Sequence, residues 1–342
     1  MTVRIEPVDV HSASEATLRG MYEATIDRDA DFYPDDPVPS FEYHTNAWLA
    51  PGGVHRKEQH WAAFDDSSIV GAARAITWVD HEDSGLVVVA VRKPNRRQQV
   101  GSQLLQHCLD GLEAQGRSKL IIDAPVGSPV EPELEHLGLK KALAERLSRL
   151  ALADVDWELM DQWIQKAHER AVEYDLLFMN APLPEQHLDN WCRISDVMNS
   201  APHEDLELED AEMTPEKWRS IERNCEARGL ALRAGAAVHR QTGEFAGLSV
   251  LMFQEHMRWL GIQDDTGVDP DHRNKGLGRL LKASMVKRFS SEFPEVEMIE
   301  TGNAGTNEPM LNINIEMGFK PALFVNAWQG DIATARDALA LS

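Results

Sequence analysis

The chain has 342 residues, of which 43% are hydrophobic and 26% charged, and its formal net charge is −22. The composition is that of a globular protein, and the length suits two domains of about 100–200 residues each. So acidic a chain repels nucleic acid and anionic membranes, and we expect it to bind neither of them. It has neither an apolar signal core nor the ~18-residue apolar run of a membrane helix. We therefore expect a cytoplasmic protein.

The first half alternates short apolar strands with helices of three- and four-residue spacing. Periodicity and turn signals predict, in chain order, a strand at 3–8, a helix at 13–29, a hairpin at 60–79, a strand at 85–91, a helix at 100–115 and a strand at 119–123. Helical spacing predicts two further helices, at 131–147 and 157–172. Residues 175–180 are expected to be the strand that closes this half.

The second half repeats this plan after a Pro-containing linker at 181–184. The predicted elements are a helix at 183–198, a helix from 215 to 228 capped by Thr214, a hairpin at 231–253, a strand at 258–268, a helix at 277–289, a strand at 296–301, a helix at 309–316 and a strand at 322–328. The pattern is an internal duplication with a period of about 170–180 residues. It predicts two domains, 1–180 and 181–342.

The three cysteines, Cys108, Cys192 and Cys225, are far apart in the sequence. No pair has the spacing of a disulfide framework or of metal ligands. We therefore expect buried thiols in a reducing compartment, and we expect no metal.

A loop rich in glycine and basic residues follows the strand that ends at Val268. Its residues lead straight into a helix: Arg273, Asn274, Lys275, Gly276, Leu277, Gly278 and Arg279. The first backbone N–H groups of a helix lack partners and attract anions, and glycine lets a phosphate approach the backbone closely. The glycine spacings of the Walker loop and of the dinucleotide-binding fingerprint are both absent. The segment therefore predicts an anion site of another kind.

The run from Arg273 to Gly278 resembles, at every fixed position, the pyrophosphate loop of the GNAT N-acetyltransferase superfamily, Arg/Gln-x-x-Gly-x-Gly/Ala. The run from Glu300 to Phe319 is similar to the superfamily's following strand and helix, which end in Gly-Phe. The resemblance implies an α/β (α+β) fold of two tandem GNAT domains, each a mixed, mostly antiparallel sheet flanked by helices. Tandem members of actinobacterial type, such as mycothiol synthase, have a similar architecture.

The resemblance also implies acetyl-CoA, or another acyl-CoA, as co-substrate. The segment from Val268 to Arg279 would hold its pyrophosphate, and Asn303 and Asn307 would bond the pantetheine arm or the strand ends beside it. The first half carries a weaker copy of this loop, because residues 91–101 align with 268–278 without gaps and Gln99 stands where Gly276 stands. A side chain there should crowd the pyrophosphate.

We therefore expect 1–180 to be a degenerate copy and 181–342 to be the catalytic domain. The alternative, that both copies bind acyl-CoA, stays open.

The amine that attacks a thioester must first lose a proton, which requires a base or a chain of water molecules. The resemblance implies a base on the strand before the loop, and strand alternation places Asp264, Thr266 and Val268 on one face. Asp264, acting through water, is the best candidate. Asp265 on the other face is the alternative, and Glu300 at the end of the neighbouring strand could assist.

The superfamily's usual general acid is a tyrosine four residues before the Gly of Gly-Phe. Asn314 occupies that position here, and no tyrosine occurs from Leu183 onward. Asn314 as a hydrogen-bond donor, a water molecule, or no group at all would then serve the departing thiolate.

The leading interpretation is an acyl-CoA-dependent N-acyltransferase, in particular an N-acetyltransferase. It would act on a primary amine of a small molecule, which the acidity of the chain allows to be polycationic. The alternatives are a non-catalytic acyl-CoA-binding or amine-sequestering protein and an acetyltransferase of protein amines. A monomer or a homodimer is expected.

Overall fold

The computed structural model describes residues 3–52, 56–66 and 68–341. The chain divides into two compact units, which are described separately. Unit 1 contains residues 1–145, 203–209 and 323–342, and unit 2 contains residues 146–202 and 210–322. These units do not coincide with the expected boundary after residue 180.

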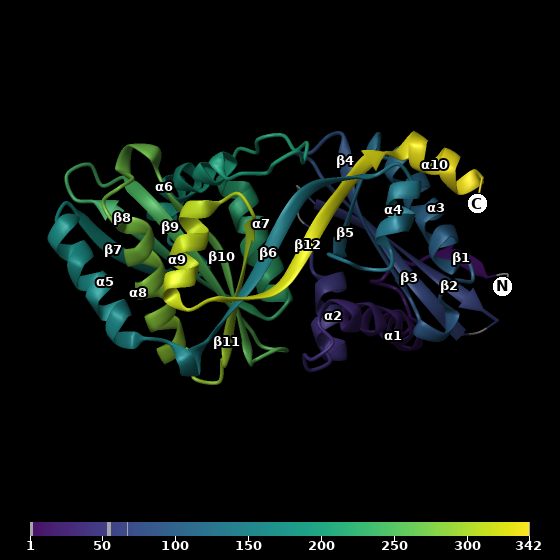
Figure 1. Ribbon diagram of the computed structural model, residues 1–342, viewed down its shortest axis with the longest axis horizontal. Helices are drawn as coiled ribbons and strands as arrows, with labels where there is room; N and C mark the ends of the chain where they lie inside the picture. The colour runs from purple at the N-terminus through teal and green to yellow at the C-terminus, as the bar shows by residue number, and fades with distance from the viewer. Residues whose placement is uncertain (1–2, 53–55, 67, 342) are drawn as a thin grey trace. The chain divides into compact units, whose positions relative to one another are not determined.

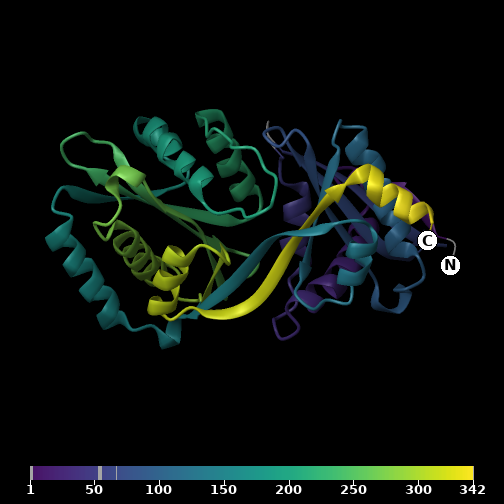
Figure 2. The ribbon, with the colours of Figure 1, turned by 45° about the horizontal axis from the view of Figure 1, so that its top comes forward.

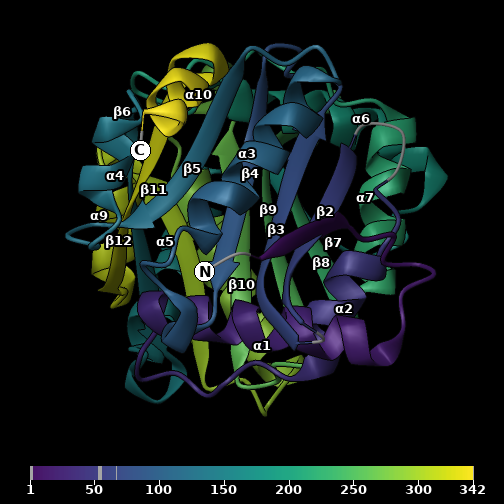
Figure 3. The same cartoon turned by 90° about the vertical axis from the view of Figure 1, so that its right-hand side faces the viewer.

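Unit 1 contains a sheet whose strands lie in the order β1-β2-β3-β4-β5, with β12 beside β5 (Figure 3). The strands are β1 (Arg4–Pro7), β2 (Arg56–Asp65), β3 (Ser68–Trp78), β4 (Ser84–Val91), β5 (Lys119–Pro125) and β12 (Lys320–Asp331). All of these neighbours pair antiparallel except β4 and β5, which are parallel. The C-terminal part of β12 pairs with β5 from Val325 opposite Pro125 to Asp331 opposite Lys119, so the end of the chain completes the first sheet.

Helices cover both faces of this sheet. They are α1 (Glu15–Phe32), α2 (Phe41–Leu49), α3 (Val100–Glu113), α4 (Glu131–His136) and α10 (Ile332–Ala340), with a 3₁₀ turn at Lys93–Asn95. Met21 and Trp48, from α1 and α2, pack on one face with Ala72 of β3. Leu104 of α3 packs on the other face with Ala73, the next residue of β3, because successive side chains of a strand point to opposite faces.

The strands of unit 2 follow the order β6-β11-β10-β9-β8-β7. The strands are β6 (Lys140–Ala151, in unit 2 from Arg146 onward), β7 (Tyr174–Asn180), β8 (Leu230–His239), β9 (Phe245–Gln254), β10 (Leu260–Val268) and β11 (Met298–Ala304). β7, β8, β9 and β10 pair antiparallel in turn, and β10 pairs parallel with β11.

The helices of unit 2 also lie on both faces of its sheet (Figure 1, Figure 2). They are α5 (Trp157–Arg170), α6 (Glu185–Ser195), α7 (Pro215–Ala227), α8 (Leu277–Glu292) and α9 (Glu308–Met317), with 3₁₀ turns at Leu152–Asp154, Asp196–Ser200 and Pro270–His272. Ala236 of β8 packs with Trp191 and Trp218 of α6 and α7, whereas the next residue, Ala237, packs with Leu280 of α8. The alternation of one strand thus separates the two helical layers.

The predicted fold class is confirmed, since each unit is a mixed, mostly antiparallel sheet flanked by helices. One predicted helix is wrong: the segment 131–147 is helical only to His136. Gly138 then adopts a left-handed φ of 81°, which ends the helix, and β6 follows. Contrary to expectation, the strand 175–180 does not close the first half, because as part of β7 it pairs with β8 in unit 2. The sequence patterns also do not predict the helix α10.

Within the described residues, no helix combines the length and apolar character needed to cross a bilayer.

Candidate functional site

The loop between β10 and α8 passes through two residues with left-handed backbone, Asn274 at a φ of 65° and Gly276 at 84°. Gly276 is the N-cap of α8, and the first helical hydrogen bond runs from the Leu280 N–H to the Gly276 carbonyl at 3.0 Å. The amides of residues 277–279 therefore lie outside the helical ladder. A Cβ atom placed on Gly276 would meet no atom within 4 Å, so the backbone faces open space. This geometry is that of an anion site at a helix N-terminus.

The basic residues of this loop differ in what they contact. The Arg273 Nε donates to the Val268 carbonyl at 3.1 Å, and one of its terminal nitrogens donates to the Ser200 hydroxyl at 3.3 Å. Arg279 instead forms an ion pair of 2.7 Å with Glu316 of α9. Arg273 is exposed, and among the described residues no carboxylate lies within ion-pair distance of it. Its remaining N–H groups are therefore available to an anion.

Tyr174 contacts this loop, and the sequence patterns do not point to it. The Lys275 ammonium donates to the Tyr174 hydroxyl at 2.7 Å, and the same hydroxyl lies 2.7 Å from the His272 Nδ1. Lys275 is also 3.7 Å from Glu173. A domain boundary after residue 180 assigns Tyr174 to the first half, whereas β7 belongs to unit 2. The pairing of β7 with β8 is what brings Tyr174 into unit 2, and this pairing is not visible in the sequence.

Unit 1 has a loop of the same backbone shape between β4 and α3. Arg97 and Gln99 take left-handed φ angles of 58° and 63°, at the positions of Asn274 and Gly276. The Arg96 Nε donates to the Val91 carbonyl at 3.1 Å, as Arg273 does to Val268 in unit 2. Gln99 is therefore accommodated by the same turn, with a side chain at the N-cap of α3.

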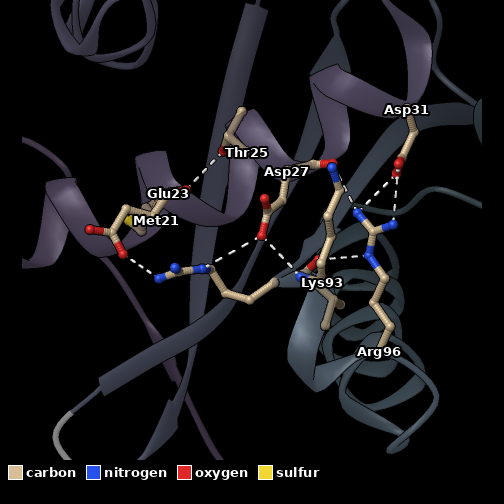
Figure 4. A network of polar contacts seen from close by, with 9 residues as sticks. Met21, Glu23, Thr25, Asp27, Asp31, Lys93 and Arg96 are labelled. Atoms are coloured by element: carbon tan, nitrogen blue, oxygen red, sulfur yellow. Dashed lines mark hydrogen bonds and ion pairs between the residues drawn. The ribbon is translucent and has the colours of Figure 1, made fainter. Parts of the chain in front are cut away.

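Carboxylates of α1 contact two arginines and one backbone amide of the unit 1 loop (Figure 4). The contacts are Arg96 with Asp31 at 2.9 Å, Arg92 with Glu23, and the Lys93 amide with Asp27 at 2.9 Å. The three acids are spaced four residues apart, so they share one face of α1. In unit 2 the neutral Ser200 contacts the corresponding arginine. The two loops share a backbone but differ in charge.

A β-bulge interrupts β10 just before the loop. Gln263 lies opposite Leu251 of β9, and Thr266 lies opposite Ser249, so three steps on β10 match two on β9. The Gln263 side-chain amide is buried and donates to the Val250 carbonyl at 2.7 Å and to the Ser249 hydroxyl at 3.2 Å. The paired register of β10 with β11 runs from Leu260 to Ile262, immediately before the bulge.

The bulge places two carboxylates, Asp264 and Asp265, side by side and exposed to solvent. The predicted shared face of Asp264, Thr266 and Val268 is wrong, because the extra residue breaks the alternation and Thr266 is buried. Although both carboxylates reach solvent, much protein surrounds them. This desolvation raises the pKa of Asp264, and it raises the pKa of Asp265 to about 7, with repulsion by Asp264 as the second cause.

The other predicted catalytic and binding residues have protein partners. Glu300 accepts from the Arg149 Nε at 2.8 Å, in an ion pair. Asn307 is the N-cap of α9, and its Oδ1 accepts from the Met310 amide at 3.4 Å. Asn303 is partly exposed on β11, beyond the residues paired with β10.

Asn314 is buried and bonded on both sides. Its Nδ2 donates to the Asn303 Oδ1 at 2.6 Å, and its Oδ1 accepts from the Lys282 Nζ at 2.6 Å. Lys282 lies on α8 with 1% of its surface exposed, and its burial lowers the pKa of its ammonium to about 7. The sequence offers no signal for this contact, because a lysine in a helix after a basic loop is ordinarily a surface residue.

Comparisons with known proteins bear on the family and on the fold. Residues 20–128 match the acetyltransferase (GNAT) family. This match falls within unit 1, whose loop carries Gln99. No curated protein matches the sequence.

Several solved structures have the same fold. A tandem GNAT protein from the clavulanic acid biosynthesis pathway superposes with a TM-score of 0.78 at 20% identity, over 97% of this chain and 99% of that one. A GCN5-related N-acetyltransferase from Sphaerobacter thermophilus gives 0.65 at 12% identity, over 96% of both chains. A glucosamine N-acetyltransferase region of a fungal multi-domain enzyme gives 0.67 at 13% identity, over 96% of this chain and 38% of that chain. Residues 20–128 therefore resemble the GNAT acetyltransferase family in sequence, and the chain as a whole has the fold of a tandem GNAT protein.

Proposed function

We propose that this chain is an acyl-CoA-dependent N-acyltransferase whose working site lies in unit 2. On this proposal the copy of the sequence duplication at 181–342, whose loop lies in unit 2, is catalytic, and the copy at 1–180 is degenerate. The observation that carries it is the contrast between two loops of one backbone shape. Gly276 leaves the helix N-terminus open where Gln99 places a side chain, and no described carboxylate pairs with Arg273 as Asp31 pairs with Arg96.

Acetyl-CoA is the proposed acyl donor. The first-turn amides of α8, together with Arg273 and Lys275, would bind its pyrophosphate, since N–H groups and cations converge there. Asn303 offers an amide to the pantetheine arm. Asn307 caps α9 with its side chain, so its proposed contribution is to hold this turn in place.

The proposed base is Asp264, acting through water, with Asp265 as the alternative. The base removes one proton from the ammonium, the free amine attacks the thioester carbon, the C–N bond forms and the C–S bond breaks. The second amine proton is lost and the thiolate takes up a proton. A carboxylate whose pKa is raised toward neutrality suits this task better than an ordinary one. Glu300 forms an ion pair with Arg149, so we propose that it assists the base and is not the base itself.

The proposed acceptor is a primary amine of a small molecule. One solved protein of the same fold is a glucosamine N-acetyltransferase region, and glucosamine is a small primary amine. The net charge of −22 favours a cationic acceptor, and a polycationic one most strongly. A cytoplasmic location fits the three cysteines, all of them buried free thiols. We propose a monomer or a homodimer.

Isothermal titration with acetyl-CoA on two matched variants tests the location of the site. Gly276→Gln copies unit 1 into unit 2, and Gln99→Gly copies unit 2 into unit 1. We expect one site per chain in the wild type, weakened at least about tenfold by Gly276→Gln, because a side chain enters the space of the pyrophosphate. Gln99→Gly should leave the affinity of that site unchanged.

Each outcome of this titration has a definite meaning. Two sites in the wild type would show that a side chain at Gln99 still allows acetyl-CoA to bind, so that unit 1 is not degenerate. This is the main alternative to the proposal, because the family match covers residues 20–128 of unit 1. No binding at all would contradict the acyltransferase proposal. Since Gln99 already adopts the left-handed turn, misfolding of Gly276→Gln is not expected.

A second candidate function is acyl-CoA binding or amine sequestration without catalysis. It is favoured by Asn314, which is 1% exposed and bonded on both sides at the position where the superfamily has its tyrosine acid. Asp264→Ala separates the two functions: an enzyme loses turnover while acetyl-CoA still binds. A screen of small amines against lysine-containing peptides then separates a small-molecule acceptor from a protein amine.

A further inference from the structure

Lys282 is a buried lysine that the proposed chemistry does not use. Its Nζ donates to the Asn314 Oδ1 at 2.6 Å, and it also lies 3.8 Å from the Met310 sulfur and 5.4 Å from the centre of the Phe319 ring. In the part of the chain that the structure describes, no carboxylate forms an ion pair with it. Burial of an ammonium with only neutral partners is costly, so such a group needs an explanation.

Unit 1 shows that the fold does not require this polar pair. The gap-free alignment of 91–101 with 268–278 continues along the helix and places Leu105 at the position of Lys282. The alignment of Gly138 with Gly318 places Leu134 at the position of Asn314. Both leucines are buried in the core of unit 1. The same pair of helix positions is therefore apolar in one unit and polar in the other.

The hydrogen bonds of the pair have a fixed direction. The charged lysine ammonium can only donate, and its contact is with the Oδ1 of Asn314, so the oxygen of that amide faces it. The Asn314 Nδ2 is then directed to Asn303, whose Oδ1 accepts at 2.6 Å. Asn303 is thereby left with its own Nδ2 as a donor, and no described residue accepts from it. Its counterpart in unit 1 is Asp123, a carboxylate, which accepts when ionised.

We propose that Lys282 is a positioning residue, which acts through Asn314 to hold the Asn303 amide with its N–H groups directed to a carbonyl oxygen of the acyl-pantetheine arm. This inference rests on the proposed function of unit 2. It assigns to three side chains the recognition of the arm, separately from the pyrophosphate loop. Without Lys282 the amide of Asn314 is free to turn, and Asn303 loses its fixed orientation.

The test uses the full chain and two ligands. Acetyl-CoA carries the pantetheine arm, whereas the 3′-phosphorylated ADP half of CoA lacks it and retains the pyrophosphate. The double variant Lys282→Leu/Asn314→Leu copies the apolar pair of unit 1. We expect it to bind acetyl-CoA about tenfold more weakly than the wild type, the usual effect of a lost hydrogen bond, and to bind the ADP half with unchanged affinity.

Asn303→Asp is the second variant, and it copies Asp123 of unit 1. It replaces the donor by an acceptor at a partly exposed position, so it should fold and should reproduce the selective loss of acetyl-CoA affinity. An equal loss for both ligands would show that the pair merely supports α8, and no loss for either ligand would show that the pair has no part in binding. Both results would overturn the inference.

Failure of the proposed function gives a different result. The wild type itself would then bind neither ligand, or Gly276→Gln would leave acetyl-CoA binding intact. If the double variant does not fold, Lys282→Met, which keeps Asn314 and the length of the side chain but removes the ammonium, takes its place with the same expected result.

Discussion

At the scale of single residues, the structure shows surroundings of the titratable groups of unit 2 that the sequence does not predict. Asp264 and Asp265 share a β-bulge, and their pKa values are raised by the same surroundings. Two interacting carboxylates lose their protons as a pair, so an acid limb in a rate profile belongs to both. In the proposed mechanism one of them takes the proton from the amine, and substitution of each in turn tests which one.

We predict that kcat/KM of the wild type rises with pH along an acid limb that lies above the ordinary range of an aspartate, because the base must be ionised to act and desolvation raises the pKa of Asp264. Asp264→Asn should lower kcat/KM by about 100-fold, a typical contribution of a general base. Asp265→Asn should keep most of the activity and shift the acid limb to lower pH, because it removes the repulsion between the two carboxylates. The measurement is a pH profile of acetyl transfer for all three proteins. The reverse pattern would identify Asp265 as the base.

Lys282 gives a prediction about stability. Its pKa is about 7 in the folded protein and 10.5 as an ordinary lysine, so between these values the unfolded chain binds more protons than the folded one. The free energy of unfolding of unit 2 should therefore rise as pH increases from about 7 toward 10.5. Lys282→Leu/Asn314→Leu should lack this rise. Urea unfolding at several pH values measures it, and identical slopes for both proteins would contradict the pKa shift.

At the scale of elements, the sequence predicts what is written in local patterns. The Gly-rich loop before α8 and the Thr214 cap of α7 are confirmed, the latter by a hydrogen bond from the Lys217 amide to the Thr214 hydroxyl at 3.3 Å. The bulge at Gln263 could not be predicted, because an extra residue is visible only against the register of β9. The predicted helix 131–147 failed for a related reason. The spacing of apolar residues stays compatible with a helix beyond His136, so it did not show that the helix ends before Gly138.

The bulge should be maintained by Gln263, whose amide bonds to β9. We predict that Gln263→Leu costs about 1–3 kcal/mol in the free energy of unfolding, since it leaves buried polar partners unsatisfied. It should also lower kcat/KM, because the two carboxylates lose their fixed position. Urea unfolding and acetyl-transfer assays measure the two effects.

Thr214→Ala is the matched control for this variant. It removes a helix cap and should cost about 1 kcal/mol in the free energy of unfolding, with kcat/KM unchanged. A bulge without catalytic importance would give the same result for Gln263→Leu, namely a loss of stability alone.

At the scale of the whole chain, the order of elements was predictable but the division into units was not. Residues 323–342 and 203–209 belong to unit 1, and residues 146–180 belong to unit 2. A duplication in sequence indicates two copies of a fold, yet it does not say which strand completes which sheet. The pairing of β12 with β5 joins segments about 200 residues apart, and no local signal carries such information.

The last prediction concerns this long-range completion. A fragment of residues 1–180 lacks β12 and α10, and with them Trp328, Ile332 and Ala335, which are buried in the core of unit 1. Loss of one buried tryptophan side chain alone typically costs about 3–5 kcal/mol, which is roughly the low end of the stability of a whole domain, about 5–15 kcal/mol. The open edge of β5 adds unpaired backbone groups.

The fragment 1–180 should therefore show no cooperative unfolding. A chain truncated after residue 322 should lose hydrogen-exchange protection in β5 and α3. A chain ended after residue 331 keeps β12 and loses only α10, so β5 should stay protected while α3, against which α10 packs, becomes less stable. If the fragment 1–180 unfolds cooperatively with native protection in β5, the boundary after residue 180 is a true domain boundary and β12 is dispensable. If only the chain that keeps β12 retains protection in β5, the folding of unit 1 depends on a strand that lies about 200 residues from β5 in the sequence.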